Sequence, residues 1–168
     1  SEMCIRDRGT AGTGGFANHG LSVGFYNSRA IEIILGVAML LFGVNFNLYY
    51  YAIIRSVRDS LKSEELKVYI AIIAASSILI FINILPIYRD AGYAGANSFF
   101  TVSSIITTTG YVSADFGKWP LFSRHLITLL MFVGGCAGST AGGIKVSRII
   151  MLYRSAVNQV KTTINPKR

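Results

Sequence analysis

Charged residues and cysteines are both scarce in this chain of 168 residues. Only 14% of the residues are charged, and 8 acidic residues stand against 16 basic ones. This low charge, a hydrophobic content of 52% and a mean hydropathy of +0.50 exclude an ordinary soluble domain and favour a membrane protein. Cys4 and Cys136 lie far apart and form no CxxC pair, which argues against a disulfide framework and a zinc site.

Catalytic constellations are also missing. The sequence shows no nucleophile beside a base, no paired intramembrane carboxylates and no metal-ligand spacing, and His19 and His125 are isolated. We therefore expect a protein that is not an enzyme and holds no cofactor or transition metal. Glu32, near the outer end of an apolar segment, is interpreted as a charge at a helix N-terminus.

Basic residues are distributed unevenly around the apolar segments. Ten lie on one side, which the positive-inside rule assigns to the cytoplasm: Arg55, Arg58, Lys62, Lys67, Lys145, Arg148, Arg154, Lys161, Lys167 and Arg168. Four lie on the other side: Arg29, Arg89, Lys118 and Arg124. They flank apolar spans instead of forming a stripe among aromatic residues, so we expect no nucleic-acid partner and a cytoplasmic C-terminal tail.

Three uncharged stretches are long enough to cross a bilayer, at residues 33–54, 68–88 and 126–144. The short basic connector between the first two predicts an antiparallel pair joined in the cytoplasm, and Trp119 fits an interfacial aromatic belt at the opposite end. Residues 97–106 are uncharged but too short to cross, which predicts a re-entrant helix. Backbone left unpaired at that depth must line a wet cavity or be buried in protein.

Two Thr-Gly segments follow one pattern: Thr13-Gly14-Gly15-Phe16 and Thr107-Thr108-Thr109-Gly110-Tyr111. Aligning Gly15 with Gly110 places Thr13 on Thr108, and an apolar helix then begins at the same distance in both copies. Glycine permits left-handed backbone that turns carbonyl oxygens toward one axis, which suits a dehydrated monovalent cation. The expected ion-binding residues are Thr13, Gly14, Gly15, Thr108, Thr109 and Gly110, with Phe16 and Tyr111 bracing them.

A glycine-rich run interrupts the third apolar stretch between Gly134 and Gly143. Glycine costs a helix up to about 1 kcal/mol relative to alanine, so the run predicts a break. Close helix packing at small-xxx-small spacing is an alternative, and a phosphate loop lacks its adjacent Gly-Lys. We favour a flexible functional loop that partly obstructs the cavity below the filter, formed by Gly134, Gly135, Gly138, Ser139, Thr140, Gly142, Gly143 and Lys145.

Together with Trp119-Pro120-Leu121-Phe122, these segments resemble the Trk/Ktr/HKT superfamily of potassium transporters, nearest the bacterial Trk-type membrane subunit. The resemblance implies an all-α membrane protein, in which four repeats of outer helix, re-entrant pore loop and inner helix surround one pseudo-fourfold pore. This chain would be a fragment, with residues 11–62 ending repeat two and residues 63–168 forming repeat three, including the gating loop and tail. Residues 1–10 are charge-dense and are expected to be a non-native or disordered leader.

The resemblance also implies potassium uptake across a bacterial plasma (inner) membrane, with K⁺ as the transported ion. It implies a homodimer, the remaining repeats of the same polypeptide, and a cytosolic nucleotide-binding regulatory subunit that the basic tail contacts, unless the tail anchors to anionic lipid instead. Two alternatives stay open: a secondary transporter whose discontinuous helix binds a small anion or amino acid, and a non-conducting membrane fragment.

Overall fold

The computed structural model describes residues 2–15, 23, 28–54, 63–88 and 90–164. Within these ranges the chain is helical and has no strand. The elements are α1 (Glu2–Ala11), α2 (Arg29–Phe42), α3 (Phe46–Ile54), α5 (Glu64–Tyr88), α6 (Ala91–Ile106), the short 3-10 turn η2 (Phe116–Lys118), α7 (Leu121–Phe132) and α8 (Val146–Ile164). This all-α architecture confirms the predicted fold class.

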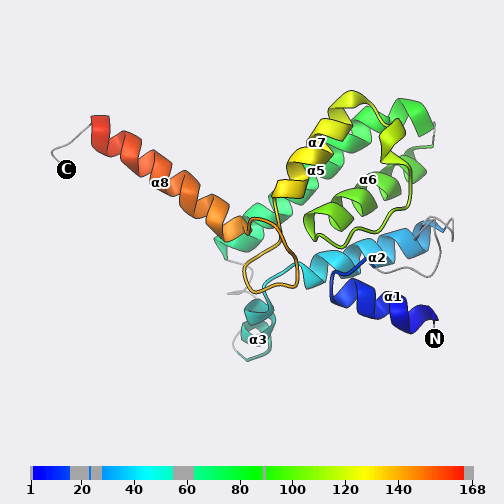
Figure 1. Cartoon of the computed structure of the whole chain (residues 1–168), viewed down its shortest axis with the longest axis horizontal. Helices are drawn as coiled ribbons and strands as arrows, with labels where there is room; N and C mark the ends of the chain where they lie inside the picture. The colour runs from blue at the N-terminus through cyan, green and yellow to red at the C-terminus, as the bar shows by residue number, and fades with distance from the viewer. Residues whose placement is uncertain (1, 16–22, 24–27, 55–62, 89, 165–168) are drawn as a thin grey trace.

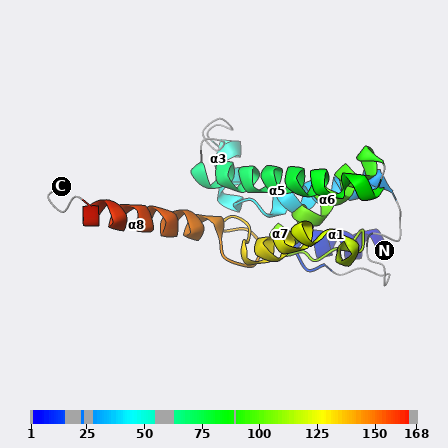
Figure 2. The same cartoon turned by 90° about the horizontal axis from the view of Figure 1, so that it is seen from above.

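Helix α6 is the centre of the bundle, with α2, α5 and α7 packed against it (Figure 1). Phe100, Val102 and Ile106 are fully buried, and small alanine and serine side chains fill the remaining contacts. Small side chains let neighbouring helices approach closely, as they do in membrane bundles. Two views show α8 projecting away from this bundle as a separate rod (Figures 1 and 2).

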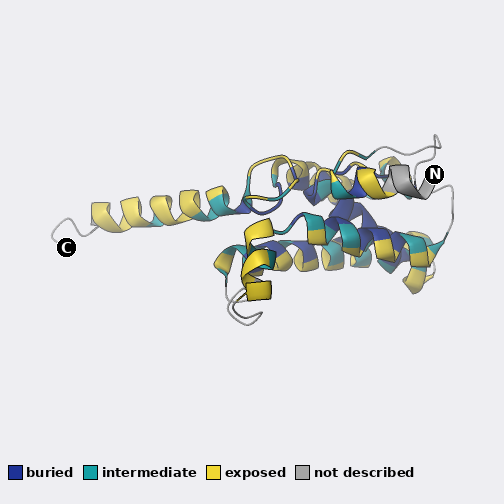
Figure 3. Cartoon of the chain, turned by 90° about the horizontal axis from the view of Figure 1, so that it is seen from below, coloured by how far each residue is buried: buried dark blue, intermediate teal, exposed yellow. Residues whose placement is uncertain are grey.

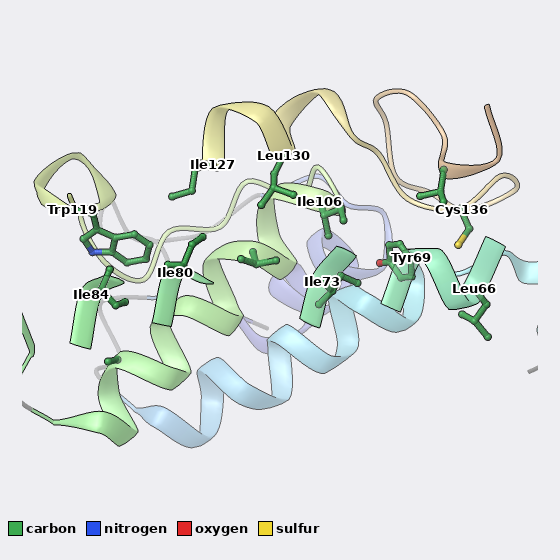
Figure 4. Packing of buried hydrophobic residues seen from close by; sticks show 13 residues of the cluster. Leu66, Tyr69, Ile73, Ile80, Ile84, Ile106, Trp119, Ile127, Leu130 and Cys136 are labelled. Atoms are coloured by element: carbon green, nitrogen blue, oxygen red, sulfur yellow. The ribbon is translucent and has the colours of Figure 1, made fainter. Parts of the chain in front are cut away.

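The main apolar core lies between α5, α6 and α7 (Figure 4). Ile80 and Ile84 of α5 meet Ile127 of α7, and Cys136 of the glycine-rich run reaches the same cluster near Tyr69. Trp119 also belongs to this core: it is 3% exposed and its Nε1 donates a hydrogen bond of 3.0 Å to the Tyr88 hydroxyl. Trp119 thus packs against protein, and the Tyr88 hydroxyl satisfies its only polar group; its place in an interfacial belt stays a prediction.

Helix α5 is the one described helix that is long and apolar enough to cross a membrane. The outward face of α5 is apolar as well, because Ile70, Ile78 and Ile82 are all exposed. Figure 3 shows how buried and exposed residues are distributed over the helices. Apolar side chains on both faces are typical of a helix that packs against protein on one side and lipid on the other.

The other two predicted spans are not continuous helices. Residues 33–54 divide into α2 and α3 at Gly43, Val44 and Asn45, and residues 126–144 leave the helix after Phe132. The first break has a local cause: the Asn45 side-chain oxygen caps α3 by accepting the Asn47 N–H at 2.9 Å. The second is the glycine-rich run, where a break was predicted and is confirmed.

Two further boundaries differ from the sequence-based expectation. The re-entrant helix α6 begins well before residue 97, because Asp90 caps it by accepting the Gly92 N–H at 2.9 Å. Residues Glu2–Ala11 form helix α1, so the expectation of disorder is wrong for them. Asp7 and Arg8 lie exposed on α1, whereas Thr10 is buried, which lets a charge-rich segment pack as a helix.

Candidate ion-binding site

The two Thr-Gly segments adopt the same backbone conformation. Thr13 and Thr108 have φ of 50° and 55°, and Gly15 and Gly110 have φ of 65° and 82°. Positive φ is uncommon for any residue with a Cβ and is an outlier for β-branched threonine. The same outlier at aligned positions supports the alignment of Gly15 with Gly110.

Backbone amides of both segments bond back to the helix that precedes them, in one pattern. Thr108 N–H donates to Ile105 three residues earlier at 3.0 Å, and Thr109 N–H to Ser104 five residues earlier at 2.9 Å. In the first copy Thr13 N–H donates to Thr10 at 3.3 Å and Gly14 N–H to Gly9 at 2.8 Å. The amide groups of the two segments are thus hydrogen-bonded to α6 and α1. The side of each segment that faces away from its helix therefore presents carbonyl oxygens.

The two segments meet each other directly. A Cβ added to Gly15 would lie 2.0 Å from the carbonyl oxygen of Thr109, so that oxygen points at the first segment. Among the described residues, no hydrogen bond reaches the carbonyl oxygens of Thr108, Thr109 or Gly110. Oxygen atoms without a donor are available to a cation.

Hydroxyl groups brace the second segment from behind. Thr107 Oγ1 donates to the Ser103 carbonyl at 2.7 Å and lies 2.8 Å from Thr109 Oγ1, and Ser104 Oγ donates to the Tyr111 carbonyl at 2.8 Å. Tyr111 is 3% exposed, and its own hydroxyl lies 3.4 Å from Thr10 Oγ1 of α1. Tyr111 therefore links the two copies, in agreement with its predicted bracing role, whereas Phe16 lies outside the described residues.

The glycine-rich run forms a loop that closes at its base. Gly134 N–H donates to the Ile144 carbonyl at 2.9 Å, and Ile144 N–H donates to the Phe132 carbonyl at 3.1 Å. A Cβ at Gly134 would lie 1.9 Å from the Gly142 carbonyl oxygen, so only glycine fits this neck. Lys145 folds back and donates to the Ala141 carbonyl. Because this run is not helical, packing of Gly134, Gly138 and Gly142 along a helix face is ruled out.

The first half of the loop is fastened to neighbouring helices. Cys136 N–H donates to the Gly43 carbonyl at 3.0 Å, and Phe46 N–H donates to the Gly138 carbonyl at 3.2 Å. The Glu65 carboxylate, at the start of α5, accepts the Ala137 N–H at 2.6 Å. These contacts also satisfy backbone groups that the break between α2 and α3 leaves without helical partners.

The second half of the loop contacts the Thr-Gly segments. Gly142 N–H donates to Thr108 Oγ1 at 2.7 Å, and Thr13 Oγ1 lies 2.9 Å from the Thr140 carbonyl oxygen. The predicted ion-binding residues and the predicted loop residues thus belong to one connected region, with the loop lying against both segments. Within the described ranges no three His, Cys, Asp or Glu side chains lie close enough to hold a metal ion, so backbone and hydroxyl oxygens are the donors present there.

Comparison with known proteins agrees with this arrangement. The family model for TrkH, described as a cation transport protein, matches residues 68–168. The chain belongs to the TrkH family. Its matched segment contains α6, the second Thr-Gly segment and the whole glycine-rich loop.

Several relatives of this TrkH-family chain are potassium uptake proteins by name. It is 32% identical over 163 residues to the Trk system potassium uptake protein TrkH of Escherichia coli strain K12, covering 94% of this chain and 33% of that protein. It is 31% identical over 160 residues to TrkG of the same strain, covering 94% of this chain and 33% of that protein. The chain thus spans about a third of the length of the curated relatives that it matches.

A solved structure shares the fold. The crystal structure of the potassium transporter TrkH from Vibrio parahaemolyticus superposes with a TM-score of 0.86 and 32% identity, covering 95% of this chain and 35% of that one. The described helices therefore have the arrangement of a membrane transporter.

Three positions that hold the loop were missed from the sequence. Gly43 and Phe46 lie inside an apolar stretch that reads as one span, and Glu65 reads as an ordinary charge at a helix start. The available signal was the Gly-Val-Asn sequence itself, since glycine followed closely by asparagine is unfavourable inside a helix and typical of a turn.

Proposed function

We propose that this chain forms part of a potassium uptake pathway in a bacterial inner membrane. Carbonyl oxygens of Thr13, Gly14, Gly15, Thr108, Thr109 and Gly110 replace part of the water shell of K⁺, which is the substrate and not a resident cofactor. The observation that carries the proposal is the Thr109 carbonyl oxygen, which faces Gly15 while the surrounding amides bond to the preceding helices. The names of the relatives support potassium as the ion.

The direction of α6 favours a cation over an anion. This helix ends at Ile106, directly before the second Thr-Gly segment, so its C-terminal end faces the site. A helix carries a partial negative charge at its C-terminus, which attracts cations. A secondary transporter for small anions would instead direct helix N-termini at its substrate.

The chain supplies two of the filter segments that such a pathway needs. In this proposal residues 11–62 end repeat two, residues 63–168 form repeat three, and the rest of a longer polypeptide supplies the other repeats. The share of the relatives that is covered supports this, because about a third of each is matched. The loop from Gly134 to Gly143, with Lys145 at its base, gates the pathway beneath the filter.

Cytoplasmic contacts are assigned to the C-terminal helix. Helix α8 carries Arg148, Arg154 and Lys161, has no acidic residue, and is exposed along most of its length (Figure 3). We assign to the intact protein a homodimer and a cytosolic nucleotide-binding regulatory subunit, for which this basic tail is a contact surface. Anionic lipid competes for the same positive charge.

Rubidium uptake tests the proposal in the intact transporter reconstituted into vesicles. In the Gly15→Ala variant we expect uptake to fall at least about tenfold, because left-handed strain of ~1–2 kcal/mol adds to an overlap costing ~1–3 kcal/mol. Gly95→Ala is the matched control, because the nearest neighbour to its new Cβ lies 3.8 Å away on Phe81. Equal rubidium uptake by Gly15→Ala and the parent protein would contradict the filter assignment.

A further inference from the structure

The hydroxyl groups of the two left-handed threonines occupy equivalent positions on the glycine-rich loop. Thr108 Oγ1 accepts the Gly142 N–H at 2.7 Å, while Thr13 Oγ1 lies 2.9 Å from the Thr140 carbonyl oxygen. These threonines are aligned in the internal repeat and share φ values of 50° and 55°. Two copies of one residue therefore contact the same loop at positions two residues apart, Thr140 and Gly142.

The chemistry of the two contacts differs. Thr108 Oγ1 donates its proton to the Thr107 carbonyl at 2.7 Å and uses a lone pair to accept from the loop, so both bonds exist together. Thr13 Oγ1 lies 2.8 Å from the Gly12 carbonyl and 2.9 Å from the Thr140 carbonyl. A hydroxyl group has one proton, so Thr13 Oγ1 can donate to the Gly12 carbonyl or to the Thr140 carbonyl, but not fully to both.

We propose that Thr13 and Thr108 are positioning residues that latch the second half of the loop against the filter and hold the pathway closed. Thr108, Thr140 and Gly142 are solvent-exposed and Thr13 is half-buried, so water can replace either latch bond when the loop leaves. The first half of the loop is held by the backbone of Gly43 and Phe46 and by Glu65, and it stays in place. The latch is therefore reversible and restricted to residues 140–142. This inference rests on the proposed function.

The contribution of the two threonine contacts can be measured as rubidium influx into vesicles that contain the intact transporter. We expect Thr108→Val and Thr13→Val each to raise influx about two- to tenfold, the equilibrium effect of losing one exposed hydrogen bond. The double variant should raise influx at least as much as either single variant, because both contacts hold the same three residues of the loop. Thr108→Ser and Thr13→Ser keep the hydroxyl and should raise influx less than the corresponding valine variants.

A second background separates the latch from damage to the filter. When residues 138–142 are deleted, both partners of the threonines are gone, so Thr108→Val should change influx no further. If Thr108→Val raises influx equally in this background, it acts on the filter and the latch is wrong. Unchanged influx in both valine variants of the intact loop would also overturn it.

Hydrogen exchange supplies a readout that does not depend on transport. In purified protein, Thr108→Val should speed amide exchange in the 138–145 peptide about two- to tenfold and leave α5 peptides unchanged. Where a valine variant does not fold, Thr108→Ala tests the same loss with a smaller side chain. Unchanged exchange in the 138–145 peptide would refute the latch. A parent protein that passes no rubidium would refute the proposed function instead, while the exchange result would still decide the latch.

Discussion

At the scale of single residues, the site depends on backbone conformations that most side chains avoid. Thr13 and Thr108 hold left-handed φ angles at a cost of roughly 1–3 kcal/mol each, which neighbouring contacts must offset. Hydrogen bonds from Thr13 and Thr108 amides to Thr10 and Ile105 supply part of that compensation. Strain of this kind collects at functional positions, and here it recurs at two aligned ones.

Gly134 is the residue at which the loop neck is most sensitive to a side chain. In Gly134→Ala the new Cβ would meet the Gly142 carbonyl oxygen at 1.9 Å, and that oxygen belongs to backbone that cannot rotate away. We expect the free energy of unfolding to fall by about 1–3 kcal/mol through overpacking, measured by thermal or denaturant unfolding of the intact transporter. Gly95→Ala should change it by no more than about 1 kcal/mol. Equal effects of the two substitutions would show that the neck tolerates a Cβ.

Sequence patterns predicted the candidate residues, but they did not predict the contacts that hold these residues in place. The register of Thr13 on Thr108 follows from the order of residues, because aligning Gly15 with Gly110 also aligns the start of the next apolar helix. Contacts such as Glu65 with Ala137 join positions far apart in the chain, so no local pattern encodes them. Trp119 shows the same limit: an aromatic residue near a span end has two possible surroundings, and only tertiary packing decides between them.

At the scale of elements, broken helices replace continuous spans wherever the loop needs backbone partners. The division between α2 and α3 provides the Gly43 carbonyl and the Phe46 N–H, and both bond to the loop. A glycine cluster predicts a helix break from local sequence, because the free-energy cost of placing glycine in a helix adds over several residues. A break of three residues inside an apolar stretch carries a much weaker signal, which is why residues 33–54 read as one helix.

The N-terminus of α6 gives a prediction about pH. A hydrogen bond from the Gly92 N–H, then the Tyr93 N–H and the Arg29 guanidinium, hold the pKa of the Asp90 carboxyl below its ordinary value. The unfolded chain binds a proton more readily, so this carboxylate stabilises the fold above about pH 4, and the contribution is lost as pH falls through the lower folded pKa. Lowering the pH from about 6 to about 3 should therefore reduce the melting temperature of the parent more than that of Asp90→Asn.

The Asp90→Asn variant is a matched control because asparagine also caps helices but does not titrate. Scanning fluorimetry of both proteins across the same buffers isolates Asp90 from the other carboxylates, which are present in each. If both melting temperatures fall by the same amount, the Asp90 carboxylate does not contribute to the stability of α6.

At the scale of the whole molecule, the two ends of α5 contact different elements, α8 at one end and the residue after turn η2 at the other. Arg154 of α8 pairs with Glu64 at the first end of α5, whereas Trp119 bonds to Tyr88 at the other. A helix of 25 residues rises about 37 Å, enough to cross a bilayer. Helix α8 and turn η2 are therefore expected on opposite sides of the membrane.

Orientation follows from the distribution of positive charge, and labelling can check it. Because α8 carries three basic residues and no acidic one, the positive-inside rule predicts that it lies on the cytoplasmic side. In an intact transporter with Cys4→Ser and no other reactive cysteine, we expect a membrane-impermeant maleimide to modify Ser155→Cys in inverted vesicles but not in whole spheroplasts. Lys118→Cys, on the exposed turn η2, is the matched control and should show the reverse pattern. If the maleimide modified Ser155→Cys in whole spheroplasts, the predicted orientation would be wrong. Helix α8 would then lie outside the cell and could not contact a cytosolic regulator.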